Sequence, residues 1–301
     1  MKYPKKIVLL IIGTILLLSL PSEARKIKTP LQQHNYKFLT EQEARNISPP
    51  ELSRATFIQD ETGKVFIVYE DGMSFFTTKN LSPKSMPQTI RKEYLAYLLS
   101  KDLSNAAEVR IIGESEVTNT PLGEWMQEQC LTEIGITRFS QDYQPEDLPY
   151  QEHTLERMIV FWVWLRDYDH GLLDWNMFTL NQDTEQLHVS YDHDTMITTE
   201  TVDDEDFSGI VWLDIVDLIK IHTPNPDVLT DLTYYVQSHY SNEKLREIIE
   251  EIEFKEESQI DPNILLNSLI SRRNTLVSDI EAIMEKAYRN VEQTSTTGVL
   301  N

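Results

Sequence analysis

The sequence has little of two things, and each shortage excludes a class of protein. It contains a single cysteine, Cys130, so neither an internal disulfide framework nor a four-thiolate zinc site can form. It also has few bases, because 27 lysines and arginines stand against 49 aspartates and glutamates, a formal net charge of −22. A chain this acidic repels a phosphate backbone, so we expect no nucleic-acid partner. Hydrophobic residues nevertheless make up 40% of the 301 positions, enough for a real core.

The apolar run at residues 7–20 is too short to span a bilayer comfortably, which takes about 20 apolar residues. Three lysines precede it within the first six positions, and Pro21-Ser-Glu-Ala24 follows it. This order is typical of a signal peptide that is cut after Ala24. We therefore expect residues 1–24 to be a signal peptide and the protein to be exported, to a periplasm, a secretory pathway or the medium. A membrane contact is expected only if the segment stays uncut and residues 7–20 act as an anchor.

The next segments predict an arm followed by a small sheet. Residues 25–52 are polar and contain three prolines, as in a linker or an N-terminal arm. Three short runs rich in β-branched and aromatic residues follow, separated by Asp/Gly turns that predict a β-meander. These runs are Ala55–Gln59, Val65–Tyr69 and Met73–Thr78, and the first turn holds Gly63 beside Lys64. A helix is predicted over 87–103, with Glu93 at the edge of its apolar face, and a strand over 108–113.

The second half is predicted to be mostly helical. Helical spacing of apolar residues predicts helices ending near 166 and covering 211–221, 226–240, 243–254 and 262–288. Residues 114–150 show no clear pattern. Strands that come before helices indicate an α+β protein with two lobes. We place the N-terminal lobe at 53–148, the helical lobe at 149–290 and a disordered tail at 291–301.

One stretch of this helical half points to chemistry. The runs Met177–Leu180 and Leu187–Tyr191 predict a hairpin, so Asn176 begins one strand and Asp192 ends the next. In an antiparallel pair those two ends lie side by side. Amide and carboxylate oxygens are suited to Mg²⁺ or Mn²⁺ that also binds phosphate oxygens, and Asp194 is a further candidate ligand.

An acid on the loop before the hairpin would face the same site. There it would orient an attacking hydroxyl or accept its proton. Asp169 is the first candidate for this role, and Asp167 and Asp174 are its rivals.

The wording Asp167-x-Asp-His…Asn176, followed by a hairpin and Tyr191-Asp-His-Asp194, resembles the protein kinase-like superfamily. It looks most like the atypical branches, the HipA-type and CotH-type kinases and the phosphoinositide lipid kinases. The resemblance implies a two-lobed kinase-like fold that binds ATP with Mg²⁺ or Mn²⁺. It further implies transfer of a phosphoryl group to a hydroxyl of a protein or a small molecule.

Carried over by position, the resemblance makes Asp169 the catalytic acid and Asn176 and Asp192 the metal ligands. Lys79 would bind nucleotide phosphates, with Glu93 as its partner. The chain departs from the family pattern in several places. Seven positions rather than five separate the acid from the asparagine, and no A-P-E segment follows the hairpin. The glycine-rich loop is absent and only Gly63 and Lys64 stand in its place, while Lys84 rivals Lys79.

Two other functions remain open from the sequence. A metal-dependent phosphohydrolase built on His170, Asp192, His193 and Asp194 is one, although such ligands usually sit on helices and His193 follows a predicted strand. A non-catalytic protein is the other, either a pseudokinase or an acidic cation-binding envelope protein. The missing glycine-rich loop favours this second alternative.

Overall fold

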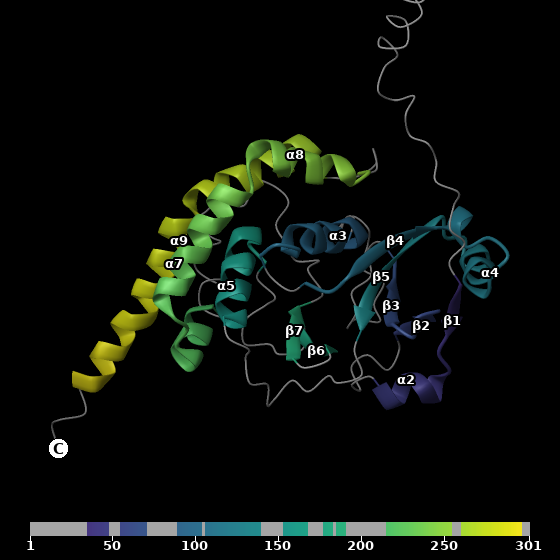
Figure 1. Ribbon diagram of the computed structural model, residues 1–301, viewed down its shortest axis with the longest axis horizontal. Coiled ribbons are helices and arrows are strands. Elements are labelled where there is room, and N and C mark those ends of the chain that lie inside the picture. The colour runs from purple at the N-terminus through teal and green to yellow at the C-terminus, as the bar shows by residue number, and fades with distance from the viewer. Residues whose placement is uncertain are drawn as a thin grey trace, which may run out of the picture. The chain divides into compact units, whose positions relative to one another are not determined.

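Within the residues described by the computed structural model of the protein, five short strands form one antiparallel sheet (Figure 1). The structure describes residues 35–47, 55–70, 89–103, 106–139, 153–167, 177–182, 185–190, 215–254 and 260–296, and for 89, 177–182, 185–190 and 290–296 it describes the backbone. All of these residues belong to one unit, Asn35–Asn301. The strand order is β1-β2-β3-β5-β4. The strands are β1 Tyr36–Phe38, β2 Thr56–Asp60, β3 Val65–Tyr69, β4 Val109–Gly113 and β5 Glu133–Phe139.

The predicted hairpin around Gly63 is confirmed. Strands β2 and β3 pair from Thr56↔Val68 to Gln59↔Val65, and the amide of Gly63 donates to the carbonyl of Asp60 over 3.0 Å. Gly63 has φ +86°, a left-handed conformation that glycine adopts without steric cost. The third predicted strand, Met73–Thr78, lies outside the described residues. The next described neighbour of β3 is β5.

Both faces of the sheet are covered with apolar side chains. Alternate residues of β3 point to opposite faces, so Phe66 and Val68 join one cluster while Val65 and Ile67 join another. The helix α4 (Pro121–Glu128) packs its Leu122 and Met126 into the first cluster, and the helix α2 (Glu41–Ile47) lies against the second. This two-sided burial explains why all five residues of β3 are buried.

Part of the stretch expected to be a linker or arm is structured. Residues 36–38 pair with β2 as strand β1, and the Tyr36 side chain is only 3% exposed. The stretch without a clear sequence pattern also contains regular elements, namely the 3₁₀ turn η3 (Glu114–Glu116), helix α4 and strand β5. The turn η3 has three residues, too few to give a periodic pattern in the sequence. Polar residues around β5 obscure the alternation of polar and apolar residues that predicts a strand.

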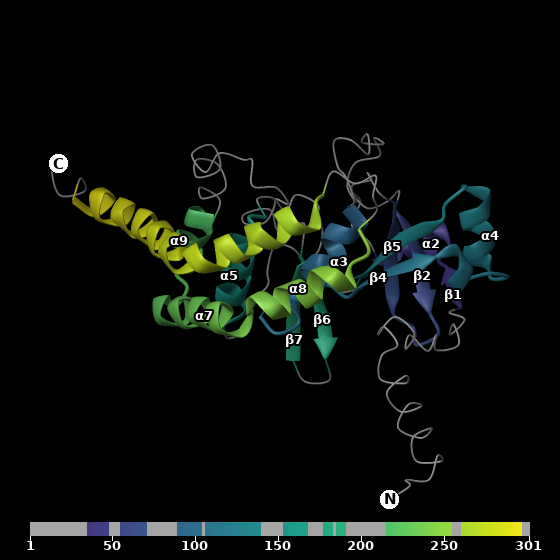
Figure 2. The ribbon, with the colours of Figure 1, turned by 90° about the horizontal axis from the view of Figure 1, so that it is seen from above.

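The helical half matches its sequence pattern closely. Helices α5 (Thr154–Leu165), α7 (Pro226–His239) and α9 (Pro262–Thr296) contact one another, and Figure 2 shows α7 beside α9. The predicted helices also include α3 (Thr89–Ser100), α8 (Asn242–Glu251) and residues 215–222. All these helices contribute to one apolar core, in which the Trp164 and Tyr240 rings lie 4.7 Å apart.

Helix α9 continues through Thr296, past the expected start of a disordered tail at 291. No glycine or proline lies between Asn263 and Thr297 to end it.

The predicted hairpin in the second half is also confirmed. Strands β6 (Met177–Gln182) and β7 (Glu185–Ser190) pair in the register Met177↔Ser190 to Gln182↔Glu185. A small antiparallel sheet and a mostly helical remainder make the chain an α+β protein. In the part of the chain that the structure describes, no helix is long and apolar enough to cross a membrane.

Candidate functional site

The predicted site residues divide into two groups. Gly63, Lys64, Glu93 and Asp167 are described by the structure. Lys79, Asp169, Asn176, Asp192 and Asp194 lie outside the described residues, as do the rival residues Lys84 and Asp174. Four described features therefore carry the structural account of the site: the turn at Gly63, helix α3, the end of α5 and the hairpin β6–β7.

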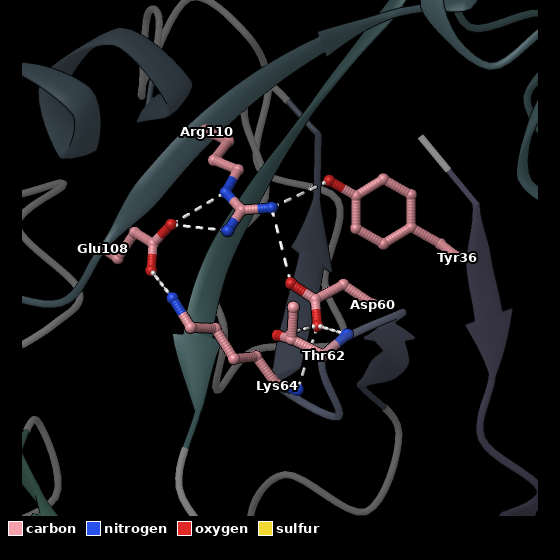
Figure 3. Close-up of polar contacts among 6 residues, drawn as sticks. All are labelled: Tyr36, Asp60, Thr62, Lys64, Glu108 and Arg110. Carbon is pink, nitrogen blue, oxygen red and sulfur yellow. Dashed lines mark hydrogen bonds and ion pairs between the residues drawn. The ribbon is translucent and has the colours of Figure 1, made fainter. Parts of the chain in front are cut away.

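The turn at Gly63 is held by Asp60, the last residue of β2. One carboxylate oxygen of Asp60 accepts hydrogen bonds from the backbone amides of Thr62 (2.9 Å) and Lys64 (3.0 Å), and from the Thr62 hydroxyl (2.6 Å). The Lys64 ammonium forms an ion pair of 3.0 Å with Glu108, as Figure 3 shows. Lys64 is therefore already engaged with a carboxylate of its own chain.

Arg110 of β4 connects this turn to the far edge of the sheet (Figure 3). Its guanidinium donates to Glu108 over 2.6 and 2.8 Å and to the Tyr36 hydroxyl over 3.2 Å, and it lies 3.6 Å from the Asp60 carboxylate. Strands β4 and β1 are the two edge strands of the sheet. In a flat sheet they would be separated by four strand spacings of about 4.8 Å each, too far for their side chains to meet easily. The contact between Arg110 and Tyr36 thus shows that the sheet curls toward this face.

The hydrogen bonds and ion pairs around Arg110 and the Gly63 turn lower the pKa of two carboxyl groups, those of Asp60 and Glu108. Burial acts to raise the pKa of Asp60, but the hydrogen bonds from Thr62 and Lys64 outweigh it, and the pKa is lowered. For Glu108, too, burial acts to raise the pKa, and the hydrogen bonds from Arg110 and Lys64 reverse the shift. Both groups are therefore held as carboxylates, and they neutralise the bases nearest the turn.

Helix α3 carries three consecutive charged side chains that are buried, Arg91, Lys92 and Glu93. Glu93, the predicted partner of the phosphate-binding lysine, is 1% exposed, and Arg91 is 4% exposed. Arg91 forms a bidentate ion pair with Glu133 of β5 and donates from Nε to the backbone carbonyl of Glu253 over 2.6 Å. The next turn of the helix adds Tyr94, whose hydroxyl donates to Glu251 over 3.0 Å. The helix is thus fixed both to the sheet and to the segment after α8.

The end of α5 leads into the predicted catalytic loop. Arg166 has φ 53°, and the amide of Asp167 donates to the Trp162 carbonyl over 3.0 Å, so the chain turns sharply out of the helix here. A left-handed conformation at a residue other than glycine costs of order 1 kcal/mol and persists only where surrounding structure imposes it. Asp167 itself is 0% exposed, and Arg272 of α9 donates to the Leu165 carbonyl over 3.1 Å. The described start of this loop is therefore held firmly.

A cavity of about 560 Å³ lies beside α3, on the side of the helix that carries Arg91 and Tyr94. Its lining includes five carboxylates and three bases: Glu108, Glu116, Glu133, Glu251, Glu253, Arg91, Lys101 and Arg110. Two of those bases are ion-paired with carboxylates of the lining itself. A net negative lining of this kind repels phosphate groups, so the cavity does not suit a nucleotide.

The described residues do not by themselves make a metal site. Within the described ranges, no group of three or more His, Cys, Asp and Glu side chains could hold a metal ion. Asn176 directly precedes the described hairpin in sequence, and Asp192 follows its last residue by two positions. The paired ends of that hairpin, Met177 and Ser190, lie opposite each other.

The structure also brings together residues that the sequence did not single out. The ion pair of Arg91 with Glu133 joins positions 42 apart, and the hydrogen bond from Arg91 to Glu253 joins positions 162 apart. The network around Arg110 likewise connects β1, β2 and β4. Contacts between residues so far apart in the sequence cannot be predicted from local residue spacing. The burial of a charged side chain on a helix points to them, and that burial is known only from the structure.

No family model matches the chain, and no curated protein matches it significantly. Among solved structures, the chain is similar to the crystal structure of a Helicobacter pylori proinflammatory kinase, CtkA, with a TM-score of 0.40 and 11% sequence identity. The match covers 78% of this chain and 91% of that chain. A likeness at this level does not establish a common fold or activity.

Proposed function

We propose that the protein is an exported, metal-dependent ATP phosphotransferase with a two-lobed, kinase-like fold. It would transfer a phosphoryl group to a hydroxyl of a protein or a small molecule. The observation that carries the proposal is the β6–β7 hairpin, whose register pairs Met177 with Ser190. Asn176 is bonded to one of these paired residues, and Asp192 lies two positions beyond the other.

The proposal makes a demand on the chain after β7. If the strand continued past Ser190, Asn176 would face Tyr191, and Asp192 would point to the opposite side of the ribbon. Convergence of Asn176 and Asp192 therefore requires the chain to leave strand geometry after Ser190.

Each residue then has a role. Asn176 and Asp192, with Asp194 nearby, would offer the oxygen ligands that Mg²⁺ or Mn²⁺ prefers. A cation bound there would supply charge neutralisation of the transferring phosphate. The catalytic acid would be Asp169, with Asp167 and Asp174 as the alternatives.

The basic partner of the phosphates would be Lys79. The two bases nearest the Gly63 turn, Lys64 and Arg110, both pair with Glu108, which leaves them poorly placed to bind phosphate. Glu93 is a buried carboxylate on the helix that follows Lys79, and a lysine is its natural partner. Gly63, at the tip of the β2–β3 turn, would let the backbone approach the nucleotide closely.

The hairpin also bears on the phosphohydrolase alternative. Ligands of the His-Asp type usually sit on helices, whereas His193 follows strand β7 by three positions. The geometry therefore favours the phosphotransferase. The assay below separates the two directly.

The experiment is a transfer assay with ATP labelled on the γ-phosphate, in Mg²⁺ and in Mn²⁺, on the wild type and on Asp192→Asn. The exposed Asp231 of α7 gives a matched control, Asp231→Asn. We expect labelled protein, or a labelled small-molecule hydroxyl, from the wild type and the control but not from Asp192→Asn. Phosphate release without transfer would support the hydrolase, and nucleotide binding with neither reaction would support the pseudokinase. A wild type that neither binds nor consumes ATP would refute the proposal.

Export has its own test. Cleavage after Ala24 in the native host would leave a chain that begins at Arg25, which N-terminal sequencing detects. A full-length chain in the membrane fraction would show instead that residues 7–20 act as an anchor.

A further inference from the structure

We infer that Arg91 is a positioning residue: it fixes helix α3, and with it Glu93, against strand β5 and the segment after α8. The inference rests on the proposed function, in which Glu93 orients the lysine that binds nucleotide phosphates. Arg91 itself touches neither nucleotide nor acceptor. It acts through the placement of the helix.

The contacts of Arg91 are unusually complete for a helix side chain. Its terminal nitrogens bind both carboxylate oxygens of Glu133, one of them over 3.0 Å, and its Nε donates to the Glu253 carbonyl over 2.6 Å. The side chain is buried, and the Glu133 side chain is 18% exposed. One guanidinium thus joins three segments that are distant in sequence, with the planar two-point geometry that only arginine provides.

The position of Arg91 on the helix makes it a suitable clamp for Glu93. The two residues are two positions apart, which places them about 200° apart around the helix axis. Arg91 therefore holds one side of α3 while Glu93 is presented on the other. A rotation or slide of the helix that breaks the Arg91 contacts would move Glu93 as well.

The clustered apolar side chains of α3 pack on the helical half, although the helix also contacts β4 and β5. Its Leu95, Leu98 and Leu99 belong to the core of the helical half. Among the side chains that the structure describes, none from α3 belongs to either apolar cluster on the sheet faces. The buried, bidentate ion pair of Arg91 with Glu133 therefore fixes the orientation of α3 relative to β5.

Loss of this link has a measurable consequence. Without the guanidinium, α3 keeps its packing on the helical core but loses a buried ionic contact with β5. Residues that share one network are energetically coupled, so we expect the Kd for Mg·ATP or Mn·ATP to rise about tenfold in Arg91→Met. Arg91→Lys keeps the charge but not the two-point geometry, so we expect it to restore little of the affinity.

A matched control separates positioning from simple loss of stability. Arg273 of α9 is also buried and donates to the Tyr240 carbonyl and to Asn242, far from α3 in sequence. We expect Arg273→Met to lower the melting temperature without changing the Kd of the folded protein. We also expect the double variant Arg91→Met/Glu93→Gln to bind nucleotide no more weakly than Glu93→Gln alone, because Arg91 acts through Glu93.

Hydrogen exchange provides a readout that does not depend on nucleotide. We expect the amides of residues 89–100 to exchange faster in Arg91→Met and Glu133→Gln than in the wild type or Arg273→Met. Unchanged exchange in α3 would overturn the inference, and so would additive losses of affinity in the double variant. A wild type that binds no nucleotide would refute the proposed function, while faster exchange in α3 would still support the clamp.

Discussion

Gly135 of β5 lies directly opposite Tyr69 of β3, and the ring of that tyrosine covers it. The two residues are paired in register, and a Cβ at position 135 would come within 2.5 Å of the ring. Tyr69 is 4% exposed, so its ring has little room to move aside. Glycine weakens a strand, and an aromatic ring laid over it compensates by packing and by excluding water. The contact helps to fix β5, the strand that also carries Glu133.

This contact predicts a specific cost for a single methyl group. We expect Gly135→Ala to lower the free energy of unfolding by about 1–3 kcal/mol, because the new Cβ overlaps a buried ring. Gly113→Ala, on the neighbouring strand, is the control, since its Cβ would meet the end of the flexible Glu116 side chain at 3.3 Å and the Ser115 hydroxyl at 3.8 Å. Urea unfolding measures both. Equal losses for the two variants would show that the Tyr69 ring is not the cause.

The network around Arg110 predicts how stability depends on pH. The pKa values of Asp60 and Glu108 are lower in the folded state than in the unfolded chain. Groups of this kind stabilise the fold above their unfolded pKa values of about 4, and this stabilisation is lost as the pH falls through the folded values. We expect Arg110→Met to cost about 1–3 kcal/mol at pH 7 and clearly less near pH 3.

Chemical denaturation at the two pH values tests this expectation. Arg45→Met is a suitable control, because the pair of Arg45 with Glu41 is an exposed i,i+4 pair on α2. Such pairs contribute about 0–1 kcal/mol. A cost for Arg110→Met that is the same at pH 7 and pH 3 would contradict the ionic account.

The two candidate phosphate-binding lysines, Lys64 and Lys79, are predicted to differ in how much they contribute to nucleotide affinity. Lys64 is already paired with Glu108, so we expect Lys64→Ala to change nucleotide affinity less than threefold, below about 0.7 kcal/mol. We expect Lys79→Ala to weaken binding more than tenfold, because it removes the charge assigned to the phosphates. Titration of both variants with Mg·ATP measures the difference. The reverse order of effects would move the phosphate-binding role to the β2–β3 turn.

Much of the fold was predictable from local pattern. The Asp/Gly turn at residues 60–64 predicted the β2–β3 hairpin, and alternating runs on either side of residues 181–186 predicted β6 and β7. The helices of the second half follow from apolar spacing, and Asp261 before Pro262 marked the start of α9. Such signals are local, so a single sequence contains them.

The rest depends on contacts that local pattern does not contain. Strand β1 has three residues and is held in place by pairing with β2. Strand β5 includes Gly135, and the ring of Tyr69 packed over it compensates for the low strand propensity of glycine. The sequence placed Glu93 at the edge of an apolar helix face and could not show that it would be buried. Nor could it show that Arg91, two positions earlier, would bind Glu133.

The central claim is that Asp192, two positions after Ser190 of β7 in the sequence, binds the cation that holds ATP. Isothermal titration of the wild type, Asp192→Asn and Asp231→Asn with ATP, each with and without Mg²⁺ or Mn²⁺, tests it most directly. We predict binding that requires the cation, with a Kd in the range of about 1 μM to 1 mM, in the wild type and Asp231→Asn, and at least tenfold weaker binding in Asp192→Asn. Absence of binding in the wild type, or equal affinity in Asp192→Asn, would contradict the claim.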